Sequence, residues 1–226
     1  MRMADRPPRR EAVAPSMRTA GAAALTIARE RVTVRIGMWR TLNDIDWAAW
    51  TPRQRATLVF VVRDGQVLLI HKKRGIGAGY INGVGGRLEP GETAAEAAVR
   101  EVREELCISP VGMRYSGHLR FQFLDGLSLD VTVFRADGYT GTPTETEEAT
   151  PVWCDLAALP YDRMWPDDPL WLPHVFSETP FEGLFLFDDR TMLDADVTTG
   201  SGAAAAGPQS SARSPSSLPP ESSTDS

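Results

Sequence analysis

A glycine-rich loop followed by a helix, residues 85–108, constrains this chain more than any other feature. Gly85 and Gly86 have no side chains, so the backbone there can approach a ligand or a metal closely. Thr93 followed by Glu96 is a capping box, which predicts a helix start. Apolar residues then recur at helical spacing, which predicts one packed stripe: Ala95, Ala98, Val99, Val102 and Leu106.

Three carboxylates are expected on one face of this helix, because successive residues lie about 100° apart: Glu101, Glu104 and Glu105. Like charges so close together destabilise a helix unless a cation lies among them. Mg²⁺ takes oxygen ligands and shares them with phosphates. The alternative is a solvated acidic face paired with Arg100 and Arg103. The glycines upstream favour the metal site.

The spacing from Gly86 through Glu92 to the run Arg100-Glu101-Val102-Arg103-Glu104-Glu105-Leu106-Cys107-Ile108 resembles the signature of the Nudix hydrolases. The resemblance implies a loop-helix-loop that holds Mg²⁺ or Mn²⁺ against a diphosphate. It also implies metal ligands or their neighbours at Gly85 (through its carbonyl), Glu101, Glu104 and Glu105, with Arg100 orienting the carboxylates. Cys107 stands where the family usually has Gly, and a left-handed Cys costs about 1 kcal/mol.

Two hairpins are predicted on either side of the helix. Residues 57–62 and 66–70 are apolar runs around Asp64-Gly65, and residues 118–124 and 127–134 flank Asp125-Gly126. A second helical stretch is expected over 170–176, interrupted by Pro173. Mixed and antiparallel strands with helices on the faces indicate an α/β fold, which the resemblance specifies as a Nudix-type α/β/α sandwich.

The domain organisation follows from composition along the chain. Residues 39–197 are expected to form the Nudix hydrolase domain, with residues 44–50 as a cover for the sheet and Trp47 and Trp50 packed within it. Residues 1–38 are interpreted as a disordered extension, or as a start assigned too early with Met38 the candidate start; an Arg-rich transit peptide is the alternative. Residues 198–226, rich in Ser, Pro and Ala, are expected to be a disordered tail.

Charge and cysteine usage limit the partners and the location. A net charge of −6 argues against a general nucleic-acid binder, which needs a basic face. The apolar runs are too short to span a bilayer, so no membrane partner is expected. The two cysteines make no disulfide framework, which indicates a reducing compartment. We therefore expect a cytoplasmic monomer acting on a small-molecule nucleoside triphosphate.

Two further stretches bear on the substrate. Residues 72–83 contain a glycine loop that fits neither a dinucleotide fingerprint nor a P-loop. Residues 164–169 place Trp165 beside Asp167 and Asp168. Each stretch alone is also consistent with an ordinary loop. In a pocket, the Trp would stack on a purine, and a crowded Asp pair would keep one member protonated as a hydrogen-bond donor.

Together, the loop Lys72-Lys73-Arg74-Gly75-Ile76-Gly77-Ala78-Gly79-Tyr80-Ile81-Asn82-Gly83, the Gly141-Thr142-Pro143 segment with its following acids and Met164-Trp165-Pro166-Asp167-Asp168 resemble the oxidised-purine nucleoside triphosphatases of the Nudix family. The resemblance implies that Asn82, Asp167 and Asp168 bond the base, that Trp165 stacks on it, and that Glu148 assists at the metal. It assigns the rest of the substrate site to Thr57, Lys72, Val84, Gly85, Gly86, Arg87, Phe121, Phe123 and Pro166.

Other substrates remain open from the sequence. Ile76 and Ile81 stand where the mammalian-type enzymes carry aromatic residues, so less stacking surface is expected and the base preference is less determined than the reaction. The alternatives are ADP-ribose, a dinucleoside polyphosphate or an unmodified triphosphate. A Nudix-fold sensor that binds a nucleotide without cutting it is a further alternative, against which the complete set of glutamates argues.

Overall fold

The computed structural model describes residues 39–200, so the expected extension 1–38 and nearly all of the expected tail lie outside the described residues. The last strand continues to Thr199, two residues beyond the expected domain boundary at residue 197. None of the helices in this described part is long and apolar enough to cross a membrane.

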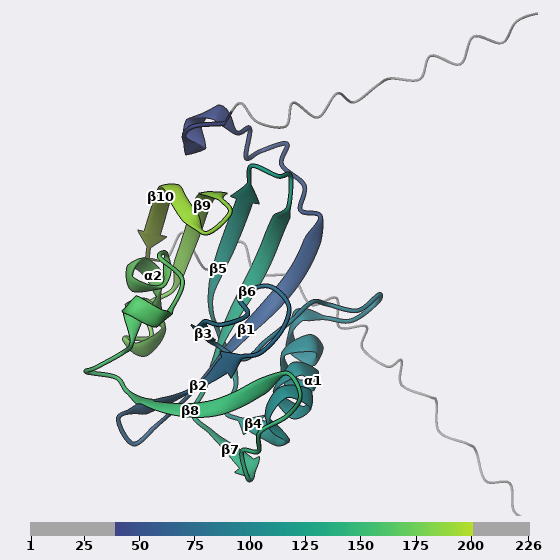
Figure 1. Cartoon of the computed structure of the whole chain (residues 1–226), viewed down its shortest axis with the longest axis vertical. Helices are drawn as coiled ribbons and strands as arrows, with labels where there is room; N and C mark the ends of the chain where they lie inside the picture. Colours follow the sequence, from purple (N-terminus) through teal and green to yellow (C-terminus); the bar gives the residue numbers. More distant parts are fainter. Residues whose placement is uncertain (1–38, 201–226) are drawn as a thin grey trace, which may run out of the picture. The chain divides into compact units, whose positions relative to one another are not determined.

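One mixed sheet organises the described residues (Figure 1). Its strands are ordered β10-β9-β5-β6-β1-β2-β3, and β8 also pairs with β2. The β1–β6 and β5–β9 pairs are parallel, and the other pairs are antiparallel. The sheet's strands are β1 Gln54–Arg63, β2 Gln66–Lys72, β3 Ile81–Asn82, β5 Arg114–Phe123, β6 Ser128–Ala136, β8 Ala149–Asp155, β9 Phe181–Asp188 and β10 Thr191–Thr199.

The remaining elements lie around this sheet. Strands β4 and β7 form a separate two-stranded ladder. The bounds are β4 Ile108–Val111, β7 Gly138–Gly141, α1 Ala94–Leu106, α2 Asp168–Phe176, and the short 3₁₀ turns η1 Leu42–Asp44 and η2 Tyr161–Arg163.

Alternation along β1 and β2 divides the core between two faces of the sheet. Val59 and Val61 pack with α1 through Ala98 and Val102. Phe60 and its neighbours face the other way and pack with α2. Because helices cover both faces, the fold is the expected α/β/α sandwich, with mixed and antiparallel strands.

Both predicted hairpins are confirmed, and the two helices differ in detail from expectation. Helix α1 buries Ala94 and Ala97 while Ala95 is exposed and Val99 half-buried, so its stripe is rotated from the predicted one. Helix α2 begins at Asp168 and continues through Pro173 without interruption. Because Pro173 has no N–H, the carbonyl of Pro169, four residues earlier, receives no helical hydrogen bond from it.

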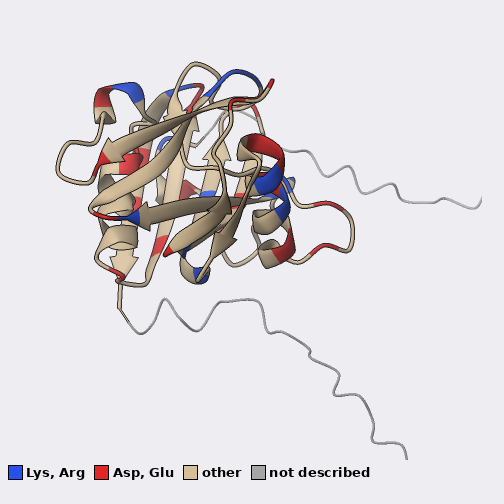
Figure 2. Cartoon of the chain, turned by 90° about the horizontal axis from the view of Figure 1, so that it is seen from below, with Lys and Arg blue, Asp and Glu red and all other residues tan. Residues whose placement is uncertain are grey.

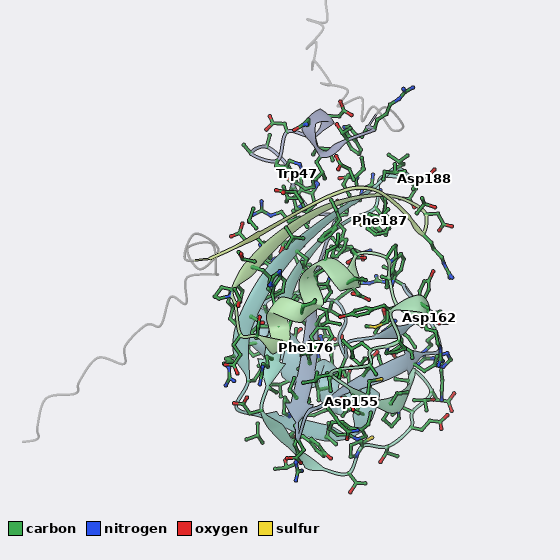
Figure 3. The ribbon with its side chains drawn as sticks, turned by 90° about the vertical axis from the view of Figure 1, so that its left-hand side faces the viewer. Trp47, Asp155, Asp162, Phe176, Phe187 and Asp188 are labelled. Atoms are coloured by element: carbon green, nitrogen blue, oxygen red, sulfur yellow. The ribbon has the colours of Figure 1, made fainter. Side chains whose placement is uncertain are left out.

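Residues 39–50 cover the outer face of β9, as expected from the sequence. Leu42 and Ile45 pack on Leu186, with Trp47 and Trp50 beside them. The Trp50 indole donates a hydrogen bond to Gln122 Oε1 at 2.9 Å. Figure 3 shows Trp47 and Phe187 on opposite sides of the β9–β10 region. Both tryptophans therefore pack on the sheet, away from the pocket described next.

Candidate active site

A cavity of about 490 Å³ opens on the α2 side of the sheet, between β1, the glycine loop and the start of α2. Gln54, Ala56, Leu58 and Phe60 line it from alternate positions of β1, since side chains on a strand point to one face every second residue. Two sets of acids line it: Glu101 and Glu105 from α1, and Asp167 and Asp168 at the start of α2.

The three glutamates of α1 differ sharply in exposure. The Glu105 side chain is 1% exposed, that of Glu101 is 12% and that of Glu104 is 60%. Glu101 and Glu105 line the cavity, and Glu104 does not. The three glutamates therefore share one side of α1, but their exposure to solvent increases across it. It begins at the buried stripe with Glu105 and ends in solvent with Glu104, where acidic and basic segments adjoin along α1 (Figure 2).

Glu105 is the best-fixed carboxylate of the set. Its Oε1 accepts a hydrogen bond from Lys72 Nζ at 2.8 Å, and its Oε2 accepts one from the Gly85 amide at 3.1 Å. A buried carboxylate is stable only with such partners, because desolvation strongly disfavours an unpaired charge. Lys72 at the end of strand β2 and the backbone at Gly85 therefore position Glu105 at the cavity wall.

Arg100 joins the loop to the helix. Its guanidinium donates to Glu92 at 2.8 Å and to Glu101 at 2.8 Å, and it lies 3.3 Å from Glu104. It also donates to the Arg87 carbonyl at 2.9 Å. The hydrogen bonds from Arg100 lower the pKa of Glu92 to about 2. Arg100 does not line the cavity, so in this structure it acts on the carboxylates and not on a ligand.

The paired glycines allow this close approach. A Cβ on Gly86 would overlap the Glu101 carboxylate, and a Cβ on Gly85 would overlap the Thr57 carbonyl. The loop can therefore lie directly against α1 and β1 only because both positions lack side chains. Cys107 ends α1 in the left-handed region, with φ 59° and ψ 26°, as the sequence predicted.

The oxygen atoms on the glutamate side of the cavity fit a divalent cation. Glu101, Glu105, Glu148 and Gly85 all line the cavity, and together they offer the oxygen ligands that Mg²⁺ and Mn²⁺ take. Burial raises the pKa of Glu101, and the charges of Glu105 and Glu104 raise it further, against the lowering effect of Arg100. A cation placed here would relieve that repulsion. Within residues 39–200, however, no three acidic, His or Cys side chains already converge as a metal cage.

Asp167 and Asp168 are buried in the cavity wall, and neither forms an ion pair with a residue of the described part of the chain. Asp167 Oδ2 accepts from the Trp171 indole at 2.8 Å, and Asp168 Oδ2 accepts from the Trp165 amide at 3.0 Å. Burial raises the pKa of Asp167 to about 6. Burial, together with the charge of Asp167, raises the pKa of Asp168 well above its usual value. Burial and mutual repulsion therefore favour a proton on the pair, and a protonated carboxyl can donate a hydrogen bond.

Further polar and aromatic groups line the same cavity. The Thr57 hydroxyl is buried and has no hydrogen-bond partner within the described part of the chain. Such an orphaned group is costly unless a bound molecule satisfies it. Trp165 and Asn82 line the same space, and Phe121 packs against Phe185 at its wall. The cavity thus combines flat apolar surfaces with a few polar groups, as small-molecule sites do.

Most of the residues expected in the site line this one cavity: Thr57, Lys72, Asn82, Gly85, Gly86, Arg87, Glu101, Glu105, Phe121, Phe123, Glu148, Trp165, Asp167 and Asp168. Two of the expected substrate residues do not line the cavity. Val84 is fully buried in the α1-side core, where its backbone pairs with Val59, and the exposed Pro166 does not line the cavity. Ile81 also packs in the core, so only Ile76 reaches the cavity.

Several wall residues escaped the sequence analysis. Alternation along β1 places Ala56, Leu58 and Phe60 on one face of the strand, and that two-residue spacing is visible in the sequence. Trp171 lies four residues after Asp167, one helical turn on, which is a spacing that a sequence also shows. Phe187 comes from β9, about 130 positions from β1, and no local pattern indicates that contact.

Comparison with known proteins identifies a family and several similar proteins. Residues 52–175 match the family model described as the NUDIX domain. The chain is 43% identical to an oxidized purine nucleoside triphosphate hydrolase of Danio rerio and 44% identical to one of Mus musculus, each over 138 residues, or 61% of this chain and 88% of the relative. A crystal structure of a MutT protein from Bacillus halodurans aligns with a TM-score of 0.57 and 25% identity, covering 64% of this chain and 97% of that one.

Proposed function

The chain belongs to the NUDIX family, and from that premise we propose that this Nudix hydrolase cleaves oxidised purine nucleoside triphosphates to the monophosphate and pyrophosphate. The observation that supports the substrate is that Asp167 and Asp168, buried and without an ion pair among the described residues, line the same cavity as the glutamates. The two relatives named above share this activity in their names.

Asp167 and Asp168 recognise the base through hydrogen bonds. The neutral member of the Asp pair donates a hydrogen bond to the oxidised purine edge, and the ionised member accepts one. The Asn82 amide makes two long hydrogen bonds, to the Gly77 carbonyl at 3.3 Å and to the Tyr80 carbonyl at 3.4 Å, and a base could replace either of them. Trp165 supplies the stacking surface. Because a proton can reside on either acid, the pair accommodates more than one donor-acceptor pattern.

The glutamates of α1 and the loop before it support the hydrolysis. Glu101, Glu105 and Glu148, which line the cavity together with Gly85, would hold Mg²⁺ or Mn²⁺, and the exposed Glu104 would be their neighbour. A bound divalent ion lowers the pKa of water and neutralises charge developing on phosphate oxygens. Lys72 and the Gly85 amide hold Glu105 in place, and Arg100 holds Glu101. Arg87, which lines the cavity, contributes positive charge to the triphosphate, and Lys72 lies beside it as the partner of Glu105. The enzyme acts as a monomer on a free nucleotide in this proposal.

A substrate panel tests the proposal: kcat/KM is compared for 8-oxo-dGTP, 2-hydroxy-dATP, dGTP, ADP-ribose and a diadenosine polyphosphate. We expect the oxidised purines to exceed dGTP by about tenfold or more, because buried polar groups left unpaired by the wrong base penalise it. Asp168→Ala is expected to remove this preference, and Asp162→Ala, an exposed acid on η2 (labelled in Figure 3), is its control.

The panel also distinguishes the alternatives. Preference for ADP-ribose or the dinucleoside compound would replace the oxidised triphosphate as substrate while keeping the Nudix chemistry. Nucleotide binding without turnover in either Mg²⁺ or Mn²⁺ would identify a sensor.

A further inference from the structure

Two aromatic rings hold the Trp165 indole in one orientation. The Tyr80 ring lies 5.2 Å from it, centroid to centroid, at an interplanar angle of 45°. The Phe187 ring meets it edge-on at 5.7 Å and 86°. Aromatic pairs favour such tilted and edge-to-face geometries. The indole therefore has a fixed tilt before any base stacks on it.

Tyr80 is itself held from behind by Arg190. The Arg190 guanidinium lies 4.9 Å from the Tyr80 ring centroid, which is the geometry of a cation–π contact. Arg190 also lies 3.5 Å from the Ala78 carbonyl, toward which it donates. Arg190 is in the turn after β9, and Phe187 is on β9 just before the same turn, next to Asp188 (labelled in Figure 3). One end of the β9–β10 hairpin thus supports the indole from two sides.

The glycine loop, residues 75–79, is part of the same assembly. Its base is closed by hydrogen bonds from the Gly79 amide to the Lys72 carbonyl at 2.8 Å and from the Lys72 amide to the Tyr80 carbonyl at 3.0 Å. A Cβ on Gly77, whose φ is +82°, would lie only 3.0 Å from Trp165 Nε1. The loop backbone therefore packs against the indole, and Gly75 and Ile76 line the cavity from this loop.

We propose that Tyr80 and Arg190 form a latch that sets the orientation of Trp165 and holds residues 75–79 over the base pocket, and so determines purine selectivity. Neither residue lines the cavity, whereas Trp165 and the loop do. Both are thus positioning residues that act through the indole. The inference rests on the proposed function, because it assumes that Trp165 stacks on the base.

The latch is tested with Tyr80→Ala, Tyr80→Phe and Arg190→Gln, measuring kcat and KM for 8-oxo-dGTP and dGTP. We expect Tyr80→Ala to lower the ratio of the two kcat/KM values about three- to tenfold, mainly by raising KM for 8-oxo-dGTP, as for loss of one aromatic pair. Tyr80→Phe should keep the parent ratio because the ring remains. Arg190→Gln should lower it about two- to threefold.

The matched control is Tyr139→Ala. Tyr139 contacts Trp153 at 6.0 Å, in another Tyr–Trp pair that does not line the cavity. This variant should keep the parent selectivity. Arg190 is exposed, so Arg190→Gln is expected to fold even if Tyr80→Ala does not.

Near-ultraviolet circular dichroism of the nucleotide-free protein gives a readout independent of turnover. The signal of Trp165, taken as the difference between each protein and its Trp165→Phe version, should change in Tyr80→Ala and not in Tyr80→Phe. An unchanged selectivity in both Tyr80→Ala and Arg190→Gln would overturn the latch. A parent enzyme without preference for 8-oxo-dGTP would instead overturn the proposed function, while a changed Trp165 signal would still report the contact.

Discussion

At the scale of single residues, this site depends on where charge is compensated and where it is not. Glu105 is buried with a donor to each of its two carboxylate oxygens, Lys72 and the Gly85 amide. Asp168 is buried with a single backbone donor among the described residues, and burial together with the charge of Asp167 raises its pKa. In the proposed function, the same carboxyl group therefore takes part in hydrolysis at Glu105 and in base recognition at Asp168.

Glu105→Gln is expected to reduce kcat by about 100-fold or more with the fold preserved. The neutral amide cannot supply the negative charge for a cation, and its NH₂ group would face a donor on one side, Lys72 or the Gly85 amide. Steady-state kinetics with circular dichroism measures this. Glu147→Gln, at an exposed acid next to Glu148, is the matched control and should retain full activity. Retained turnover in Glu105→Gln would remove Glu105 from the reaction.

The Asp pair predicts a pH dependence of stability with a definite sign. Asp167 has a usual pKa of 3.8 and a folded pKa of about 6, so the folded state binds more protons than the unfolded state between these values. The stabilisation is fully present below pH 3.8 and is lost as pH rises through 6. Asp167→Asn cannot titrate. Its free energy of unfolding, from urea denaturation, should therefore fall less steeply across this window than that of the parent. Parallel curves would contradict a shifted Asp167.

At the scale of elements, α1 and its flanking turns show what local sequence determines. The Thr93–Glu96 box closes the helix start through hydrogen bonds of 2.8 Å and 3.2 Å, and the Asp64-Gly65 turn joins β1 to β2. Both features depend on a few neighbouring residues, so the sequence predicts them. The β9–β10 hairpin turns at Asp188–Arg190 without a glycine, and its pairing with β5 joins segments far apart in the chain. No short-range pattern carries that information.

The same contrast separates the predicted from the unpredicted parts of the site. The glutamates and Gly85-Gly86 lie within one motif, and their spacing identifies them. The contact of Arg190 with Tyr80 spans 110 positions and depends on the sheet order, so it emerges only from the fold. Val84 shows the opposite case: it lies inside the motif, yet the strand-like bridge to Val59 turns it into the core.

Cys107→Gly is expected to stabilise the fold by about 1 kcal/mol, because glycine adopts the left-handed conformation without a Cβ penalty. Cys107 has φ 59° at the C-cap of α1 and its side chain is exposed, so the substitution removes strain and no core packing. Chemical denaturation measures the gain. The kcat should stay within about twofold, since the cap lies outside the cavity. A destabilised variant would show that the thiol makes a contribution larger than the backbone strain.

At the scale of the whole molecule, charge is the main obstacle to the proposed reaction. The chain carries a net charge of −6, and its cavity gathers Glu101, Glu105 and Glu148 near the place proposed for a triphosphate. Lys72 is already paired with Glu105, and Arg74 with Glu148. The cations within this wall are thus largely committed to its own carboxylates. A polyanion is therefore expected to bind productively only together with additional positive charge.

This balance predicts a strict requirement for a divalent ion that monovalent salt cannot replace. EDTA should reduce hydrolysis of 8-oxo-dGTP to background, and Mg²⁺ or Mn²⁺ should restore it. NaCl at matched ionic strength should not, because screening weakens repulsion without activating water. Calorimetric titration of Mn²⁺ into the nucleotide-bound parent and into Glu101→Gln adds a readout besides turnover, with weaker binding expected in the variant. Full activity in EDTA would mean that Lys72, Arg74 and Arg87 alone offset the substrate charge, and the glutamates would then need another role.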